Sequence, residues 1–426
     1  MQFAEDLLFR TSKKSIGLLL ILSLFPFVYG IIPGWKKMQS DFPNYYVSAN
    51  LIANGKAVDS LYHADWFQNQ IYSHGISEQG KFSPFPPPTA LILTPIAGFD
   101  ALSAKRIWLV FNILLLLPIV LLLHRISGLS ISGSLILLLS CGVGLVNNFM
   151  LGQMYLLLLF ILLSAYFFLL RGNAGSTGLL LGGGIAVKYF PLVFAPTLIA
   201  EKRWKSLAST AVMIALIHSV CMGIMGLQVY KEYILDVLFQ HLNGNLSGQS
   251  SWSASFQSWN SLGHQLFLSH DVFNPKPLMN SLVCFYFVKY GIPLLVGIFT
   301  ARLFFLYKKQ VDFIEASLAM VSVAVLLCSP AGATYHGILL LFPLGLQCRI
   351  LIDRKMTNGI LLVLFNLLLI GYLPPLLEKL TVAQYNLFFT YTRLWLYMSL
   401  YILMHWQLHK ISRMSEVKNE SFVSPA

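Results

Sequence analysis

Charge is what this sequence has little of. Only 11% of its 426 residues are Asp, Glu, Lys or Arg, whereas a soluble domain carries about 25%. Hydrophobic residues make up 56% of the chain. Uncharged stretches long enough to cross a bilayer recur along nearly the whole length, and they begin with residues 15–35. The sequence therefore predicts an integral membrane protein.

Several common site motifs are also missing. The five cysteines lie in or beside apolar runs, with neither C-x-x-C nor metal-ligand spacing, at Cys141, Cys221, Cys284, Cys328 and Cys348. The sequence has no P-loop, dinucleotide glycine motif or G-x-S-x-G elbow. We expect no metal site and no cofactor. The net charge of +12 is more typical of cytoplasmic loops in a membrane protein than of a nucleic-acid partner.

The basic residues predict a topology. They cluster at 10–14, 202–205, 302–309, 349–355 and 410–418, and the positive-inside rule assigns these clusters to the cytoplasm. The result is an all-α bundle of about 12 transmembrane helices, with an uncleaved first helix and both termini cytoplasmic. We expect one transmembrane domain over 1–410, extracytoplasmic loops at about 36–106 and 227–280, and a disordered polar tail over 411–426.

Two segments do not fit simple spans. The run "TALILTPIAGF", within 88–100, is short for a span, and we expect an interfacial helix on the outer surface. The rival interpretation makes it a span and inverts helices 107–170. The second segment, "GLLLGGGIAVKYFPLVFAP", must go out and back within 175–200, so it requires one long helix or a broken pair.

Two charged residues stand out. Asp41 follows the first helix at headgroup depth, where it can be a general base, a helix cap or a partner for Lys36 or Lys37. Lys188 lies inside an otherwise uncharged segment with no acidic residue near it in sequence. A buried anion is its natural partner, which favours the phosphate of a ligand.

Other polar residues have two interpretations each. Lys105 and Arg106 either reach lipid headgroups or bind phosphate. Gln153, in "NNFMLGQMY", either hydrogen-bonds a sugar or belongs to a plain polar turn. The aromatic and hydroxyl-rich loop 251–265 suits carbohydrate, although an ordinary exposed loop has the same composition. His336 is placed at the outer mouth of two helices, on the side of Asp41.

The order of these landmarks resembles a known family. An aspartate after helix one is followed by an aromatic-Pro-Pro element, "GQ", "GLLLGGGIAVKYFP", "NSLG" and "SP…YH". This pattern is similar to membrane glycosyltransferases of the GT-C type. Within them it most resembles glycosyltransferase family 87, the polyprenol-phosphate-mannose-dependent α-1,2-mannosyltransferase-like proteins. The resemblance runs from about residue 40 to about residue 345.

The resemblance implies roles for individual residues. It makes Asp41 the general base, and it places positive charge for the donor phosphate at Lys188, His336, Lys105 and Arg106. It implies substrate-binding positions at Tyr45, Tyr62, Gln153, Asn260 and Ser261. Phe85 and Tyr335 depart from the family pattern, which has Tyr and His there, and an arginine usual after the "NSLG" element is missing.

The implied reaction is an inverting transfer in the cell membrane, on the extracytoplasmic side. A sugar, mannose by the resemblance, would pass from a polyprenyl phosphate to a hydroxyl of a glycolipid or glycan acceptor, without metal or cofactor. The partners are therefore the lipid-linked donor, the acceptor and membrane lipids, with no nucleic acid. The alternative is a flippase or exporter of lipid-linked glycans without group transfer.

Overall fold

The protein is all-α, as the sequence predicts. The computed structural model describes residues 8–245, 250–378 and 387–423, with side chains as far as residue 414. Within these ranges it contains helices and turns and no strand, apart from an isolated bridge between His270 and Asn274.

Six helices in the described residues are long and apolar enough to cross a membrane, and they are listed here by their bounds: Lys13–Lys36, Ala101–Ser127, Trp204–Met225, Leu282–Tyr307, Thr334–Asp353 and Thr357–Leu377. A broken pair, Ile131–Leu139 with Val143–Leu151, raises the number to seven. The predicted number of about 12 is not confirmed, because several predicted spans are shorter apolar helices. The spans leave large apolar side chains outside, including Leu20, Leu117 and Val212, each more than 60% exposed. Such faces are suited to lipid.

The described chain divides into two compact units, and the single transmembrane domain over 1–410 stays a prediction. The first consists of 20–122 and 143–251, and the second of 1–19, 123–142 and 252–426. Two helices run across the boundaries in the chain, α2 (Lys13–Pro26) and α6 (Ala101–Ser127).

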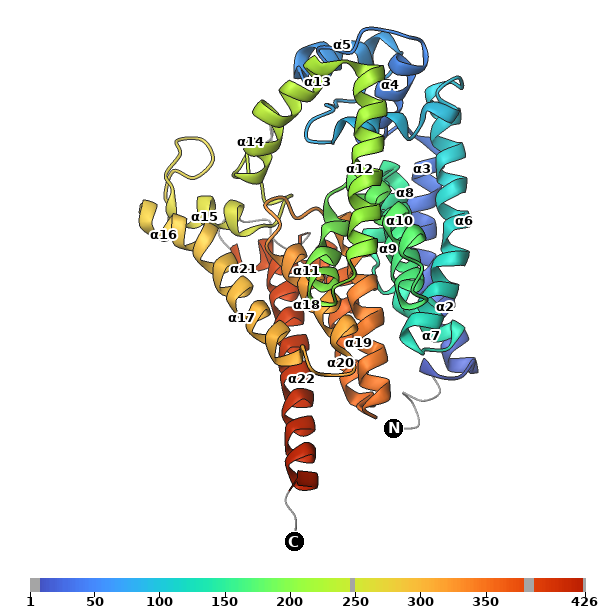
Figure 1. Ribbon diagram of the computed structural model, residues 1–426. Helices are drawn as coiled ribbons and strands as arrows, with labels where there is room; N and C mark the ends of the chain where they lie inside the picture. Colours follow the sequence, from blue (N-terminus) through green and yellow to red (C-terminus); the bar gives the residue numbers. More distant parts are fainter. Residues whose placement is uncertain (1–7, 246–249, 379–386, 424–426) are drawn as a thin grey trace. The chain divides into compact units, whose positions relative to one another are not determined.

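The first unit contains a helical bundle and the segments that form the candidate site. Figure 1 shows α9, α10 and α12 side by side in it. Its elements are η1 (Phe27–Ile31), α3 (Ile32–Lys36), α4 (Phe42–Ala53), α5 (Ala64–Ser73), η2 (Pro87–Leu91), η3 (Thr94–Ile96), α8 (Val143–Leu151), α9 (Tyr155–Leu170), α10 (Ala174–Val187), η4 (Phe190–Val193), α11 (Phe194–Ala200), α12 (Trp204–Met225), α13 (Leu227–Glu232), η5 (Tyr233–Leu238) and α14 (Phe239–Leu242).

Two irregular segments of this unit can be compared with the predictions made for them. The segment 175–200 is a broken pair, since α10 ends at Val187 and a 3-10 turn over Phe190–Val193 leads into α11. The predicted interfacial helix over 88–100 is wrong in form. It is replaced by two short 3-10 helices, of which the first is buried at Pro87, Pro88, Thr89 and Ala90. Consecutive prolines lack the N–H groups that a regular α-helix requires.

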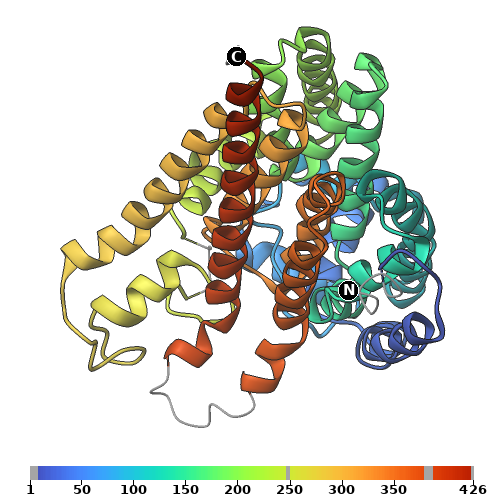
Figure 2. The same cartoon turned by 90° about the horizontal axis from the view of Figure 1, so that it is seen from below.

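The second unit is dominated by long helices. Figure 2 shows α20 and α22 running alongside one another in it. Its elements are α7 (Ile131–Leu139), α15 (Trp259–Phe267), α16 (Leu282–Tyr286), η6 (Phe287–Gly291), α17 (Ile292–Tyr307), α18 (Phe313–Leu327), η7 (Thr334–Leu340), α19 (Leu341–Asp353), α20 (Thr357–Glu378), α21 (Leu387–Thr390) and α22 (Thr392–Val423). Because α22 continues to Val423, the chain is helical over most of the predicted disordered tail, 411–426.

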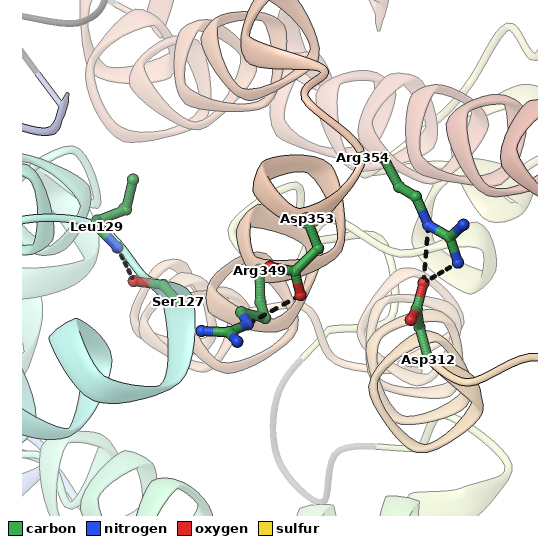
Figure 3. A network of polar contacts seen from close by, with 6 residues as sticks. All are labelled: Ser127, Leu129, Asp312, Arg349, Asp353 and Arg354. Carbon is green, nitrogen blue, oxygen red and sulfur yellow. Dashed lines mark hydrogen bonds and ion pairs between the residues drawn. The ribbon is translucent and has the colours of Figure 1, made fainter.

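Two ion pairs lie at helix ends in the second unit, and one of them joins two helices. Arg354, after α19, donates to Asp312, before α18, at 2.8 Å, and Arg349 donates to Asp353 within α19 at 3.0 Å (Figure 3). The first pair joins two helices and is the less exposed, with side chains 31% and 15% exposed against 48% and 48%.

We expect Asp312→Ala to lower the thermal unfolding midpoint in detergent more than Asp353→Ala does. Removing one partner of a partly buried pair that joins two helices costs about 1–2 kcal/mol, whereas an exposed pair within one helix contributes about 0.3–0.5 kcal/mol. Equal midpoints for the two variants would contradict this ranking.

Candidate active site

Asp41 lies between α3 and α4 and its side chain is held by a single hydrogen bond. It occupies the N-cap position of α4, yet its side chain makes no capping hydrogen bond. Among the described residues it forms no ion pair with Lys36 or Lys37. Instead, its Oδ2 accepts a hydrogen bond from Gln153 Nε2 at 2.6 Å. The cap and the ion pair with these lysines, two interpretations that the sequence leaves open, therefore lack support.

Gln153 connects Asp41 to Tyr45. Its Oε1 accepts from the Tyr45 hydroxyl at 2.8 Å, and its side chain is almost completely buried. Because both ends of the amide are engaged, its orientation is fixed and the N–H points at the carboxylate. Three residues that the sequence nominates separately, Asp41, Tyr45 and Gln153, thus form one chain of hydrogen bonds.

The turn that carries Gln153 is built by buried polar side chains. Gly152 has φ +68°, and its carbonyl accepts from Trp108 Nε1 at 3.0 Å. Asn148 accepts from the backbone N–H of Tyr155 and donates to Asn112 of α6 at 3.1 Å. Sequence reasoning missed Asn112 and Asn148, although buried asparagines within apolar helices were a visible signal.

The surroundings of Asp41 favour a basic carboxylate. Burial raises the pKa of Asp41 above its ordinary value of 3.8, while the hydrogen bond from Gln153 and the charge of Lys188 act in the opposite direction. A carboxylate with a raised pKa is a stronger proton acceptor.

Lys188 lies at the break after α10, close to aromatic rings. Its Nζ is 4.0 Å from the centroid of the Phe85 ring, 5.5 Å from that of Tyr155 and 6.0 Å from that of Tyr45. Within the described residues it has no ion pair and no hydrogen bond through Nζ. Aromatic faces stabilise a cation but leave its N–H donors available, so this ammonium can still bind an anion.

Tyr62 and Thr89 hold the loop on which Phe85 lies. The Tyr62 hydroxyl donates to the Phe85 carbonyl at 2.7 Å, and the Thr89 hydroxyl donates to the Val187 carbonyl at 3.0 Å. The second bond joins the proline-rich segment to the residue before Lys188. Tyr62 therefore acts on the backbone in this structure, and its predicted substrate contact stays a prediction.

Lys105 and Arg106 lie against the end of the first span. Lys105 Nζ donates to the Lys37 carbonyl at 2.6 Å, and Arg106 Nε donates to the Trp35 carbonyl at 3.1 Å, with its guanidinium 5.3 Å from the centroid of the Trp35 ring. Lys105 is 1% exposed. These cations satisfy carbonyls near the C-terminal end of α3, and their phosphate-binding role stays a prediction.

The remaining predicted residues belong to the other compact unit. Ser261 takes part in a capping box with Ser258 at the start of α15, Asn260 is buried in the same turn, and the His336 ring accepts from the Ala333 N–H at 3.2 Å. Arg393 of α22 donates to the carbonyls of Ser255 and Gly332. An arginine from far along the chain thus joins the two loops that flank Ser261 and His336. The substrate roles of Asn260, Ser261 and His336 stay predictions.

We expect Gly152→Ala to destabilise the protein by about 2 kcal/mol or more, because an alanine is strained at positive φ and its Cβ would lie 2.7 Å from the Phe42 ring. The control is Gly183→Ala in α10, where no atom lies within 4 Å of the added carbon. A thiol-reactive dye can follow unfolding through the buried free cysteines. A midpoint for Gly152→Ala as high as that of the control would contradict the close approach.

One of three comparisons with known proteins identifies a family. The sequence model of glycosyltransferase family 87 matches residues 84–330, more than half of the chain. The match includes Lys105, Arg106, Gln153 and Lys188, while Asp41 lies before it. No curated protein and no solved structure matches the chain. The chain therefore belongs to glycosyltransferase family 87 and is a multi-pass membrane glycosyltransferase.

Proposed function

We propose that this glycosyltransferase moves a sugar, mannose by family resemblance, from a polyprenyl phosphate to an acceptor hydroxyl with inversion. The observation that carries the proposal is the combination of a positioned carboxylate and a cation that forms no direct ion pair within the described residues. Asp41 is oriented by Gln153, and the Lys188 ammonium contacts aromatic rings that include Tyr45, itself bonded to Gln153.

In the proposed reaction, Asp41 accepts the proton of the acceptor hydroxyl as its oxygen attacks the anomeric carbon. The bond from that carbon to the phosphate oxygen breaks, and its electron pair leaves with the lipid phosphate. Lys188 neutralises the negative charge that develops on this leaving group. Because the phosphate is already a good leaving group, one base is sufficient, and a single displacement inverts the configuration.

The environment of Lys188 supports an anionic donor. A lysine without an acidic partner in a weakly solvated site is costly, and a ligand phosphate would remove that cost. We propose that the donor reaches the site within the outer half of the bilayer. Its lipid tail would remain among the exposed apolar helix faces, and the acceptor would approach from the extracytoplasmic side, with both termini cytoplasmic.

The test is transfer from radiolabelled polyprenyl phosphate sugars in membranes containing the wild type or Asp41→Asn. We expect label in a glycolipid or glycan fraction for the wild type and a loss of about 10²–10⁴-fold in the variant, because general-base catalysis contributes a factor of that order. The control is Asp65→Asn, an exposed carboxylate in the first turn of α5.

Equal transfer by Asp41→Asn and the wild type, at equal expression, would remove Asp41 as the base. If the wild type transfers no sugar from any donor while it moves lipid across the bilayer, the transferase proposal is wrong.

The pH dependence provides a second prediction. The hydrogen bond from Gln153 stabilises the ionised form of Asp41 and so lowers its pKa. Gln153→Leu should raise that pKa and move the acidic limb of kcat/KM to higher pH. Activity lost at low pH should then return in part as the pH rises. The exposed Gln79→Leu is the control. An unchanged acidic limb in Gln153→Leu would show that this limb does not report Asp41.

A further inference from the structure

Five buried polar atoms of the first unit have no hydrogen-bond partner among the described residues, and one of them is Oγ of Ser83. The other four are the hydroxyl oxygens of Tyr189 and Tyr233, Oε2 of Glu232 and Nδ1 of His241. Buried polar groups are nearly always satisfied, and an unsatisfied one indicates a missing water, ion or ligand. Three of the four atoms come from the short segment of α13, η5 and α14, and the fourth follows Lys188 directly in the chain.

Tyr189 and Tyr233 border the candidate active site, and Tyr189 directly follows Lys188 in the chain. The Tyr233 ring stacks on Tyr62 at 5.6 Å between centroids, and Tyr62 donates its hydroxyl to the Phe85 carbonyl. The Phe85 ring lies 4.0 Å from Lys188 Nζ. A continuous series of contacts therefore leads from the buried Tyr233 side chain to the ammonium that faces the proposed donor phosphate.

The chemistry of the cluster suits hydroxyl groups. Burial, together with the charges of Lys188 and Lys81, lowers the pKa of His241 to about 4, so its imidazole is neutral near pH 7. A neutral imidazole, two phenol hydroxyls and a carboxylate oxygen include both donors and acceptors. The charges of Lys188 and Lys81 both act on His241. Hydroxyl-binding groups together with positive charge are the combination that a sugar phosphate requires.

The opposite face of the segment suits a lipid. Ile234, Leu235, Phe239 and Leu242 are between 45% and 67% exposed, whereas Tyr233 is only 5% exposed. A helix with an apolar outer face lies at a membrane surface, which is where a lipid-borne sugar arrives.

We propose that Tyr189, Glu232, Tyr233 and His241 form the subsite that hydrogen-bonds the hydroxyl groups of the donor sugar. This inference rests on the proposed function and adds to it the residues that select the sugar. A sugar-binding role for these hydroxyl groups can be distinguished from a stabilising role by measurement. Removing an unsatisfied buried hydroxyl does not lower the stability of the unliganded protein.

The neighbouring Tyr230 provides a matched control. It is 5% exposed, as Tyr233 is, but its hydroxyl donates to the His218 carbonyl at 3.2 Å and lies 3.0 Å from His218 Nδ1. Tyr233→Phe and Tyr230→Phe remove the same atom from the same segment. Only the second change breaks a hydrogen bond within the protein.

The experiment measures binding of two probes to detergent-solubilised wild type and variants in the absence of acceptor. One probe is a short-chain prenyl phosphate mannose and the other is the same prenyl phosphate without the sugar. We expect Tyr233→Phe and Tyr189→Phe to weaken binding of the first about three- to tenfold, the value of one lost hydrogen bond, and to leave binding of the second unchanged. Their unfolding midpoints should be no lower than that of the wild type. Tyr230→Phe should lower the midpoint and leave both affinities unchanged.

Equal affinity changes for the two probes, or no change in Tyr233→Phe and Tyr189→Phe, would overturn the subsite. A fall in the midpoint of Tyr233→Phe as large as that of Tyr230→Phe would also overturn it, since the hydroxyl would then have a partner within the protein. If the wild type binds neither probe, the proposed donor is wrong. The outcomes for the subsite and for the donor are therefore distinct.

Discussion

The hydrogen bond from Gln153 to Asp41 is the contact on which the arrangement of the site depends. It joins the end of the first span to the turn between α8 and α9, and it exists because Gly152 allows that turn to approach Phe42 closely. Asn148 and Asn112 fix the same turn through buried amides. A base that must meet a lipid-borne substrate has little water to orient it, so the protein itself supplies the orientation.

Three cations of the first unit, Lys105, Arg106 and Lys188, differ in the groups that surround them. Lys105 and Arg106 donate to backbone carbonyls near the end of the first span, whereas Lys188 Nζ lies near aromatic rings and forms no ion pair within the described residues. The first two cations therefore each satisfy a backbone carbonyl. Lys188 keeps its donors available, and the break after α10 is the feature that places it there. Among these three cations, Lys188 is the one whose environment fits a binding role.

Two breaks between apolar helices of the first unit have the same structural consequence. The chain departs from regular helix at Gly152 and at residues 188–193, and each departure supplies a polar or charged side chain to the region around Tyr45. Irregular backbone at membrane depth is tolerated where it is buried in protein or lines a cavity. The same rule applies to the unsatisfied atoms of Tyr189 and Tyr233, since buried polar groups that the protein leaves unpaired are available to a ligand.

The sequence by itself determined the class of protein, because composition and charge are local properties. It left 175–200 open between one long helix and a broken pair, and it nominated Asp41, Tyr45, Gln153 and Lys188 as site residues. Its number of about 12 spans is not confirmed, since an apolar run does not show whether its helix crosses a membrane or breaks. Tertiary structure alone decided that Asp41 faces Gln153 rather than capping α4. It also decided that Lys105 and Arg106 face carbonyls and that the Tyr233 ring stacks on Tyr62. These facts depend on contacts between residues far apart in the chain, and the spacing of residues along the sequence does not predict such contacts.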